Sequence, residues 1–316
     1  MKFIWLGFVL GFTCFIIGVY LWFSSSLKPI SNQSNPKVFI VNPGDPANLV
    51  LKNLKSQNFI KNYYVARIYY QFVAKNMVFR PGVYYLSADK SVAETLKIVS
   101  IGPKDIKITF PEGWRREQYA ARLNVTFPGF DTGEFLKLTA TLEGRLFPDT
   151  YYLPASPSPQ KVVSILISNF ANKTKLDLSN SQTLILASLV ERESNNPNDS
   201  KIIAGILLKR LKNNWPLQID ATVQYAKDTQ NCQKTYLTCD YWKPIYDTKF
   251  ISAYNTYLNP GLPPTPIASP GLASIQAVIN PQDSEYWYYL TGNNHQTYYA
   301  KDLATHQKHI DSYLKP

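Results

Sequence analysis

The sequence predicts an α+β protein that begins with a single transmembrane helix. Three observations lead to this prediction: one long uncharged apolar run at the N-terminus, alternating short strand and helix patterns over residues 37–108, and a longer mixed remainder rich in turn residues. We expect an anchor at 1–27, a linker at 28–36, a small α+β domain at 37–108 and a mixed α+β domain at 109–316.

The composition excludes several protein classes. With 45% hydrophobic and 17% charged residues, the chain is neither disordered nor fibrous. Three cysteines are too few to hold 316 residues together, so a packed core must do so. A multi-pass membrane protein is excluded as well, because the sequence contains one long uncharged run.

That run covers residues 3–23, which are 21 consecutive residues without a charge. As a helix it would span roughly 30 Å, the thickness of a bilayer's hydrocarbon core. Cleavable signal peptides have a shorter apolar stretch of about 7–15 residues. We therefore expect an uncleaved anchor, and a cleaved signal is the alternative. The short N-terminal stub favours a cytoplasmic N-terminus and an extracytoplasmic remainder, although Lys2 and Lys28 leave the flanking charge nearly balanced.

Positive charge is concentrated after the anchor. Residues 28–110 contain 12 Lys+Arg and 4 Asp+Glu, a net charge of +8 out of +11 for the chain. This excess suits anionic lipid headgroups or an anionic envelope polymer, and simple solubility is the alternative. We do not expect nucleic acid as a partner, because the charge is scattered and follows an anchor.

The small domain is predicted element by element. A strand at 38–41 ends at Asn42-Pro43-Gly44, and Asp45-Pro46 is a typical helix start. A second helix is expected at about 62–75 and a strand at 83–86. Ser91 and Glu94 form the spacing of a capping box that opens a third helix. A strand at 106–110 completes the order β-α-α-β-α-β.

Helical spacing of apolar residues predicts the elements of the longer domain. Helices are expected at about 116–124, 159–174, 181–193, 198–213 and 271–278. Residues 216–225 alternate apolar and polar groups and then continue as a short helix. From residue 240 onward the chain is rich in Pro, Tyr and Asn, which indicates loops and short strands.

Glu191 is the candidate catalytic carboxyl. On the helix expected at 181–193 it shares a stripe with the apolar Leu184 and Ala187, whereas Glu193 points about 200° away. A half-buried carboxyl has a raised pKa and can act as a general acid near neutral pH. The alternative is that Glu191 begins the polar end of the helix and pairs with a cation.

Other chemistries have weaker sequence support. His306 and His309 share a helix face without a third metal ligand, and the sequence contains neither a G-x-S-x-G motif nor a phosphate-binding loop. Cys232 and Cys239 are spaced for a small disulfide loop, and two free thiols are the alternative.

A sugar-binding cleft is the favoured interpretation of the polar and aromatic residues near 216–225 and 254–257. Amide and carboxylate groups bind hydroxyls, and pyranose faces stack on aromatic rings. The candidates for substrate positioning are Gln218, Asp220, Tyr225, Tyr254 and Asn255. Ordinary loop capping is the alternative for each of them.

Seven motifs in order make the sequence resemble the endolytic murein transglycosylases of the MltG/YceG-like family. They are P-E-G-W at 111–114, E-G-x-L-F-P-D-T-Y at 143–151, L-A-S-L-V-E-R-E at 186–193, P-L-Q-I-D-A-T-V-Q-Y at 216–225, A-Y-N-T-Y at 253–257, G-L-P-P-T-P-I at 261–267 and S-P-G at 269–271. Asp220-Ala221-Thr222 and Pro264-Thr265-Pro266 depart from the family pattern.

The resemblance implies a LysM-like fold for 37–108 and a peptidoglycan lyase in the domain at 109–316. By this analogy Glu191 is the single acid/base that cleaves the bond between N-acetylmuramic acid and N-acetylglucosamine, forms a 1,6-anhydro end and terminates strand elongation, with no metal or cofactor. Glycan strands, the membrane and possible peptidoglycan synthases are the expected partners. A non-catalytic cell-wall scaffold and a hydrolytic muramidase are the alternatives.

Overall fold

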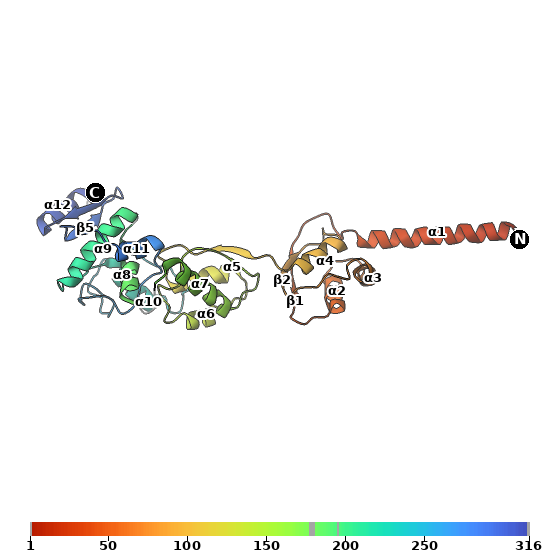
Figure 1. The fold of residues 1–316 in the computed structure, drawn as a ribbon, viewed down its shortest axis with the longest axis horizontal. Helices are drawn as coiled ribbons and strands as arrows, with labels where there is room; N and C mark the ends of the chain where they lie inside the picture. Colours follow the sequence, from red (N-terminus) through yellow and green to blue (C-terminus); the bar gives the residue numbers. More distant parts are fainter. Residues whose placement is uncertain (1, 177–180, 195, 315–316) are drawn as a thin grey trace. The chain divides into compact units, whose positions relative to one another are not determined.

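The computed structural model describes residues 2–176, 181–194 and 196–314, with side chains described from residue 10 onward. The chain divides into two units, one comprising residues 1–106 with 152–156 and the other residues 107–151 with 157–316 (Figure 1). Helices and short antiparallel strands occur in both units. The expected mixed α+β class is therefore confirmed.

The first helix, α1 (Lys2–Leu27), contains the predicted apolar run. Its window Leu10–Leu27 has a mean hydropathy of 1.6 and is 6% buried, so by length and composition it is a candidate membrane span. A signal sequence near the N-terminus would have the same properties.

The rest of the N-terminal unit follows the predicted order of elements. These are β1 (Lys37–Val41), α2 (Ala47–Ser56), α3 (Tyr63–Phe72), β2 (Gly82–Leu86), α4 (Val92–Ile101) and the start of β3 (Ile106–Thr109). Strands β1 and β2 are antiparallel, with Phe39 opposite Tyr84. Side chains from one face of this pair, including Phe39 and Leu86, join α2 and α4 in a buried apolar core.

Local hydrogen bonds explain where these helices begin. Ser91 and Glu94 form the predicted capping box at the start of α4. Asn62 caps α3 by accepting from the backbone N–H groups of Tyr64 and Val65. Asp45 differs from the expectation: its carboxylate accepts from the N–H of Asn42, and α2 begins after Pro46.

The C-terminal unit contains more elements than the sequence predicts. The elements of this unit are α5 (Arg116–Thr126), α6 (Thr132–Leu138), the first half of β4 (Thr150–Leu153), α7 (Pro159–Thr174), α8 (Ser181–Glu193), α9 (Pro197–Lys212), α10 (Asp220–Asn231), α11 (Leu272–Ile279), β5 (Tyr288–Thr291), β6 (Thr297–Ala300) and α12 (Leu303–Tyr313). The bounds predicted for α7 and α8 are confirmed. The short helix α6 was not predicted, because seven residues give too little periodicity to identify it.

Helix α8 supplies much of the core of this unit. Every residue from Leu184 to Val190 is buried, and α8 packs against α9 and α11. The same cluster includes Leu217 and Ile219 from the segment before α10. Strands β5 and β6 form an antiparallel hairpin against which α12 packs. The polar C-terminal end of α8 therefore emerges from a rigid apolar core.

Candidate active site

The C-terminal end of α8 carries two glutamates in different environments. Glu191 and Glu193 follow the buried stretch of the helix and are separated by Arg192. Two residues on a helix project about 200° apart, so the two carboxyls leave the core in different directions.

Glu193 lines a cavity of about 470 Å³. The other lining residues come from α9, the segment before α10, the start of α10, the 254–257 loop, β5, and α12 with its C-cap. They are Arg210, Gln218, Asp220, Tyr257, Tyr288, Tyr289, Leu290, Leu303, His306, Ile310 and Leu314. This volume suits a small ligand such as part of an oligosaccharide. The cavity combines charged groups with tyrosine rings.

Burial is the main reason that the pKa of Glu193 is raised, from 4.5 to about 7. The negative charge of Asp220 raises this pKa further, whereas the hydrogen bond from Tyr289 and the charges of Arg192 and Arg210 lower it. The Tyr289 hydroxyl donates to Oε2 of Glu193 at 2.9 Å. Glu193 can therefore be protonated in a substantial fraction of molecules at neutral pH.

Arg210 brings positive charge to the same cavity. Its guanidinium donates to the carbonyl oxygens of Trp287 and Leu217 at distances between 2.7 and 3.0 Å, which fix its position. Because these partners are neutral, the guanidinium charge near Glu193 is not cancelled by them. Burial lowers the pKa of Arg210, yet an arginine pKa is ordinarily so high that the side chain remains charged.

Gln218 and Asp220 are two predicted substrate-binding residues that line this cavity. Gln218 has a left-handed backbone with φ of 56°, and its N–H donates to the carbonyl of Thr256 at 3.2 Å. Asp220 is the first residue of α10, and its Oδ1 accepts from the Tyr257 hydroxyl at 2.6 Å. The segment before α10 is thus tied to the 254–257 loop, and both contribute to the wall of the cavity.

The other three predicted residues lie outside the lining of this cavity. Asn255 is fully buried and donates to the carbonyls of Thr248 and Phe250 at 2.8 and 2.7 Å, so in this structure it stabilises its own loop. Tyr225 is 7% exposed and its hydroxyl donates to Glu143. Tyr254 is half-buried and its ring lies 5.0 Å from that of Tyr225. The Asn255 amide is therefore used within its own loop, and the Tyr225 and Tyr254 rings pack against each other.

Glu191 lies at the N-terminus of α11. Its Oε2 accepts from the Gly271 N–H at 3.0 Å and from the Ser274 hydroxyl at 2.7 Å. Burial is the main reason that the pKa of Glu191 is raised, and the charge of Glu112 adds to this. Gly271 is the N-cap residue of α11, so the Glu191 carboxylate lies at the positive end of that helix's dipole.

Three of the motifs meet at Glu191. The N–H of Gly113 donates to the Ser269 carbonyl at 2.9 Å, and the N–H of Ser269 donates to the Trp114 carbonyl at 2.7 Å. A Cβ atom at Gly271 would lie 1.8 Å from Oε1 of Glu112, so a side chain here would require the end of the Glu112 side chain to move. The P-E-G-W and S-P-G segments therefore pack closely around the Glu191 side chain.

A buried charged cluster beside Tyr225 was not predicted from the sequence. Arg115 is 1% exposed, lies 4.3 Å from the centroid of the Tyr225 ring and pairs with Glu117 at 2.7 Å. Burial is the main reason that the pKa of Glu143 is raised, to about 8, and the carboxyl accepts from the Arg116 N–H and the Tyr225 hydroxyl. The E-G-x-L-F-P-D-T-Y motif thus contributes its glutamate to the interior of the unit.

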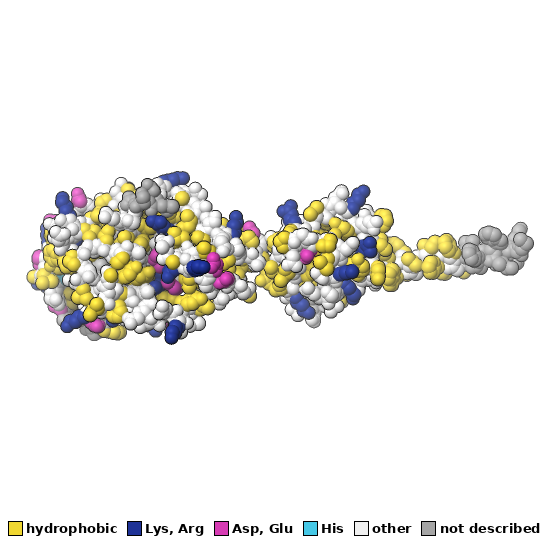
Figure 2. Space-filling model, turned by 90° about the horizontal axis from the view of Figure 1, so that it is seen from below, with side chains coloured by type: hydrophobic (Ala, Val, Ile, Leu, Met, Phe, Trp, Pro, Cys, Tyr) yellow, Lys and Arg dark blue, Asp and Glu magenta, His cyan; other side chains and the backbone are white. Residues whose placement is uncertain are grey.

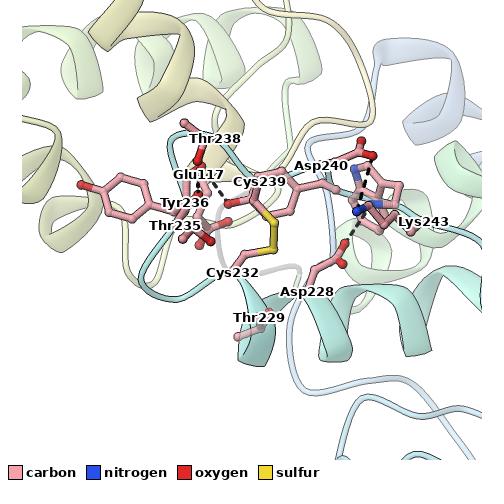
Figure 3. The surroundings of a disulfide bond; sticks show 12 residues. Glu117, Asp228, Thr229, Cys232, Thr235, Tyr236, Thr238, Cys239, Asp240 and Lys243 are labelled. Atoms are coloured by element: carbon pink, nitrogen blue, oxygen red, sulfur yellow. Dashed lines mark hydrogen bonds and ion pairs between the residues drawn. A yellow bond between two sulfur atoms is a disulfide. The ribbon is translucent and has the colours of Figure 1, made fainter.

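The predicted disulfide between Cys232 and Cys239 is present and closes a short loop after α10 (Figure 3). Beyond this loop, the N–H of Trp242 donates to Asp228 at 2.8 Å, and its indole Nε1 donates to Gln118 at 3.1 Å. The Arg192 guanidinium stacks 4.1 Å from the Trp242 ring. The segment that contains the disulfide thereby reaches the residue between the two glutamates.

Comparison with known proteins places the chain in a family. Residues 39–312 match the model of the YceG-like family. The chain belongs to the YceG-like family. It is 27% identical over 335 residues to a Bacillus subtilis (strain 168) protein named endolytic murein transglycosylase, covering 94% of this chain and 90% of the relative. The family resemblance inferred from the motifs is confirmed.

Two further relatives extend the comparison. A Streptococcus pneumoniae (strain R6) endolytic murein transglycosylase is 25% identical over 345 residues, and the match covers 93% of this chain and 62% of that protein's length. The crystal structure of a yceG-like protein from Listeria monocytogenes matches with a TM-score of 0.55 at 24% identity, covering 87% of this chain and 99% of the other. The similarity to the Listeria monocytogenes structure supports the overall fold of the chain.

Glu193 was not among the site residues predicted from the sequence, whereas Glu191 as the catalytic residue stays a prediction. Helical periodicity places Glu191 on the apolar side of α8 and Glu193 on the polar side. It does not say whether the polar side faces solvent or other parts of the chain. Here the polar side faces Asp220, Tyr289 and Arg210 from distant segments. A sequence signal was available only in the spacing E-R-E, which supplies two carboxyls without saying which one faces a cavity.

Proposed function

We propose that this YceG-like chain is a peptidoglycan lytic transglycosylase whose acid/base is a glutamate at the C-terminal end of α8. The names of its relatives in Bacillus subtilis and Streptococcus pneumoniae support this reaction class. The observation that carries the proposal is the cavity of about 470 Å³ in which Glu193, with a pKa raised to about 7, faces Gln218 and Asp220.

Between the two glutamates, the geometry favours Glu193 as the acid. It faces a cavity large enough for a sugar, and its pKa lies near neutral pH, where proton donation and acceptance are both efficient. The Glu191 carboxylate instead binds the N-terminus of α11 through two donors. Glu191, the residue expected from the sequence, remains the competing assignment, and the two make different predictions for mutants.

A single carboxyl suffices for the proposed chemistry. The protonated acid donates its proton to the glycosidic oxygen between N-acetylmuramic acid and N-acetylglucosamine as the bond to C1 breaks. The C6 hydroxyl of the muramyl residue then attacks C1 and gives its proton to the carboxylate, which restores the acid and leaves a 1,6-anhydro end. Because the nucleophile belongs to the substrate, a second carboxylate to activate water is not required.

The cavity residues have distinct proposed roles. Asp220 and Gln218 would bind sugar hydroxyl or acetamido groups, while Tyr257 holds the Asp220 carboxylate in position. Arg210 would stabilise the carboxylate form of Glu193 after proton transfer. Asn255, Tyr225 and Tyr254 would act indirectly by holding the 254–257 loop and the start of α10.

We further propose that α1 anchors the protein in the cytoplasmic membrane, with residues 28–36 as linker and 37–316 outside the cytoplasm. The length and apolar composition of α1 support an anchor. The order β1-α2-α3-β2 supports a LysM-like module at 37–108, followed by a catalytic domain at 109–316. This location would bring the enzyme to nascent glycan strands and to the synthases that make them, so that cleavage terminates elongation.

The test is to incubate the full chain in detergent with un-crosslinked glycan strands and to weigh the products. A lyase yields 1,6-anhydro ends, whereas a hydrolase adds one water to each product. Glu193→Gln should remove anhydro product while glycan binding persists. A chain that binds strands but releases no product would instead be a scaffold, and water-containing ends would identify a muramidase.

A further inference from the structure

Helix α3 carries an apolar stripe that is exposed in the N-terminal unit. Tyr64, Ile68 and Phe72 are spaced by four residues and therefore lie on one face of the helix. Their exposed fractions are 70%, 45% and 74%, and Val73 immediately after the helix is 67% exposed. The other side of α3 already fills the core, since Val65 and Ala66 are fully buried. Folding of the unit therefore buries the opposite face of α3 and leaves the stripe exposed.

The stripe lies next to the end of the candidate membrane span. Helix α3 packs against α1, and the Lys61 ammonium donates to the Ser25 carbonyl at 3.1 Å. Leu27, the last residue of α1, packs against the core of the same unit. Figure 1 shows α3 on the side of the N-terminal unit from which α1 leaves. A bilayer spanned by α1 would therefore have its surface near α3.

The charge around the stripe suits an anionic lipid surface. Arg67 and Lys75 are exposed and lie beside it in sequence, and residues 28–110 carry a net charge of +8. Figure 2 shows Lys and Arg distributed over the visible face of this unit with few acidic side chains. Aromatic and aliphatic side chains flanked by cations are typical of helices that lie in the headgroup region.

We propose that the face formed by Tyr64, Ile68 and Phe72 docks into the headgroup region of an anionic phospholipid bilayer. The inference rests on the membrane anchor proposed above, because continuity with α1 is what brings the bilayer to this face. Two attachments, one spanning and one interfacial, would hold the N-terminal unit in a fixed orientation on the membrane. A single spanning helix alone would leave the unit free to rotate about its end.

The test places an environment-sensitive fluorophore on the stripe in the full chain. Phe72→Cys, made with Cys14→Ser, is labelled with a nitrobenzoxadiazole dye, and the protein is reconstituted into vesicles that contain phosphatidylglycerol. The matched control is Tyr85→Cys in the same background, because Tyr85 is 51% exposed on β2 of the same unit. Quenching is measured with lipids carrying a spin label near the headgroup and, separately, with aqueous iodide.

We expect the label at 72 to be quenched by the shallow lipid probe at least threefold more than the label at 85, and to be protected from iodide. Tyr64→Ser combined with Ile68→Ser should reduce the lipid quenching at 72 by at least half, as should replacing phosphatidylglycerol with neutral lipid. Equal quenching at 72 and 85 would overturn the proposal. Protection from iodide without lipid quenching would also overturn it, since a protein, such as a second copy, would then cover the stripe.

Labelling Cys14 in the otherwise unchanged chain separates this inference from the anchor on which it rests. Cys14 is the exposed free cysteine of α1 and should be quenched by a spin label placed deep in the acyl chains. Deep quenching at Cys14 without shallow quenching at 72 would refute the docking of α3 but leave the membrane anchor supported. Absence of quenching at Cys14 would refute the anchor, and formation of anhydro products on the same vesicles tests the enzyme independently.

Discussion

Replacing Glu193 by Gln should remove most of the proposed activity, because the structure indicates that Glu193 is protonated in many molecules at neutral pH. Burial beside Asp220 raises the pKa of Glu193 from 4.5 to about 7, despite the Tyr289 hydrogen bond. At pH 7 about half of the molecules then carry the acid form, compared with about 0.3% for a carboxyl with a pKa of 4.5, a gain of about 150-fold. The Gln amide cannot donate this proton, so we expect a loss of about 10²–10⁴-fold in product formation.

The rate of anhydro product formation should follow the titration of Glu193. Above a pH of about 7 the wild-type rate should fall about tenfold per pH unit, and it should level off below that pH. Glu191→Gln is the matched variant, because its amide oxygen can still accept from Gly271 and Ser274 at the N-terminus of α11. We expect it to retain most of the activity and the same alkaline limb.

Initial rates are measured by mass spectrometry of products from un-crosslinked glycan strands between pH 5 and 9. Circular dichroism at each pH controls for folding. If Glu193→Gln keeps wild-type activity while Glu191→Gln loses it, the assignment to the cavity is wrong and Glu191 is the acid. An alkaline limb that begins near pH 5 would show that the environment does not raise the pKa.

The free energy of unfolding should also depend on pH through the titration of Glu193. The pKa of Glu193 is higher in the folded chain than in the unfolded chain, so its favourable contribution is fully present below pH 4.5 and is lost as pH rises through about 7. Over that range the wild type should lose about 3 kcal/mol relative to Glu193→Gln in the free energy of unfolding. Urea unfolding of both proteins in detergent, followed by tryptophan fluorescence, measures the difference, and parallel curves would contradict the shift.

Three further predictions follow from contacts in the C-terminal unit. Tyr289→Phe removes a hydrogen bond that lowers the pKa of Glu193, so the alkaline limb should move to higher pH; an unchanged or lower limb would contradict that role. Cys232→Ser opens a loop with a sequence separation of seven and should lower the free energy of unfolding by about 2–3 kcal/mol, as measured in urea, with no further effect of reductant. Asn255→Ala leaves the carbonyls of Thr248 and Phe250 without their donor and should cost about 2–3 kcal/mol in unfolding free energy, whereas a loss of activity at unchanged stability would indicate direct substrate contact.

The periodic elements were predictable because their information is local. Apolar residues at helical spacing gave the bounds of α7 and α8, and the Ser91–Glu94 pair gave the start of α4. The seven ordered motifs gave the family, which the match over 39–312 confirms. The spacing of Cys232 and Cys239 allowed either a disulfide or two free thiols, and the structure contains the disulfide.

The location of the cavity could not be predicted from the same local patterns. Glu193, Gln218 and Tyr289 lie far apart in the sequence, and only the packing of α8, the segment before α10 and β5 places them around one space. Likewise, the motif that contains Asn255 suggested substrate contact, but local patterns could not show that its amide donates to the carbonyls of Thr248 and Phe250.

The sequence by itself determined the apolar N-terminal helix, the order of most helices and strands, and a glutamate pair at the end of α8. Only the tertiary structure decided that Glu193 faces a cavity and that Glu191 binds the start of α11. Helical periodicity reports which side of a helix is apolar, whereas the pKa and reach of a carboxyl depend on groups brought near it from elsewhere in the chain.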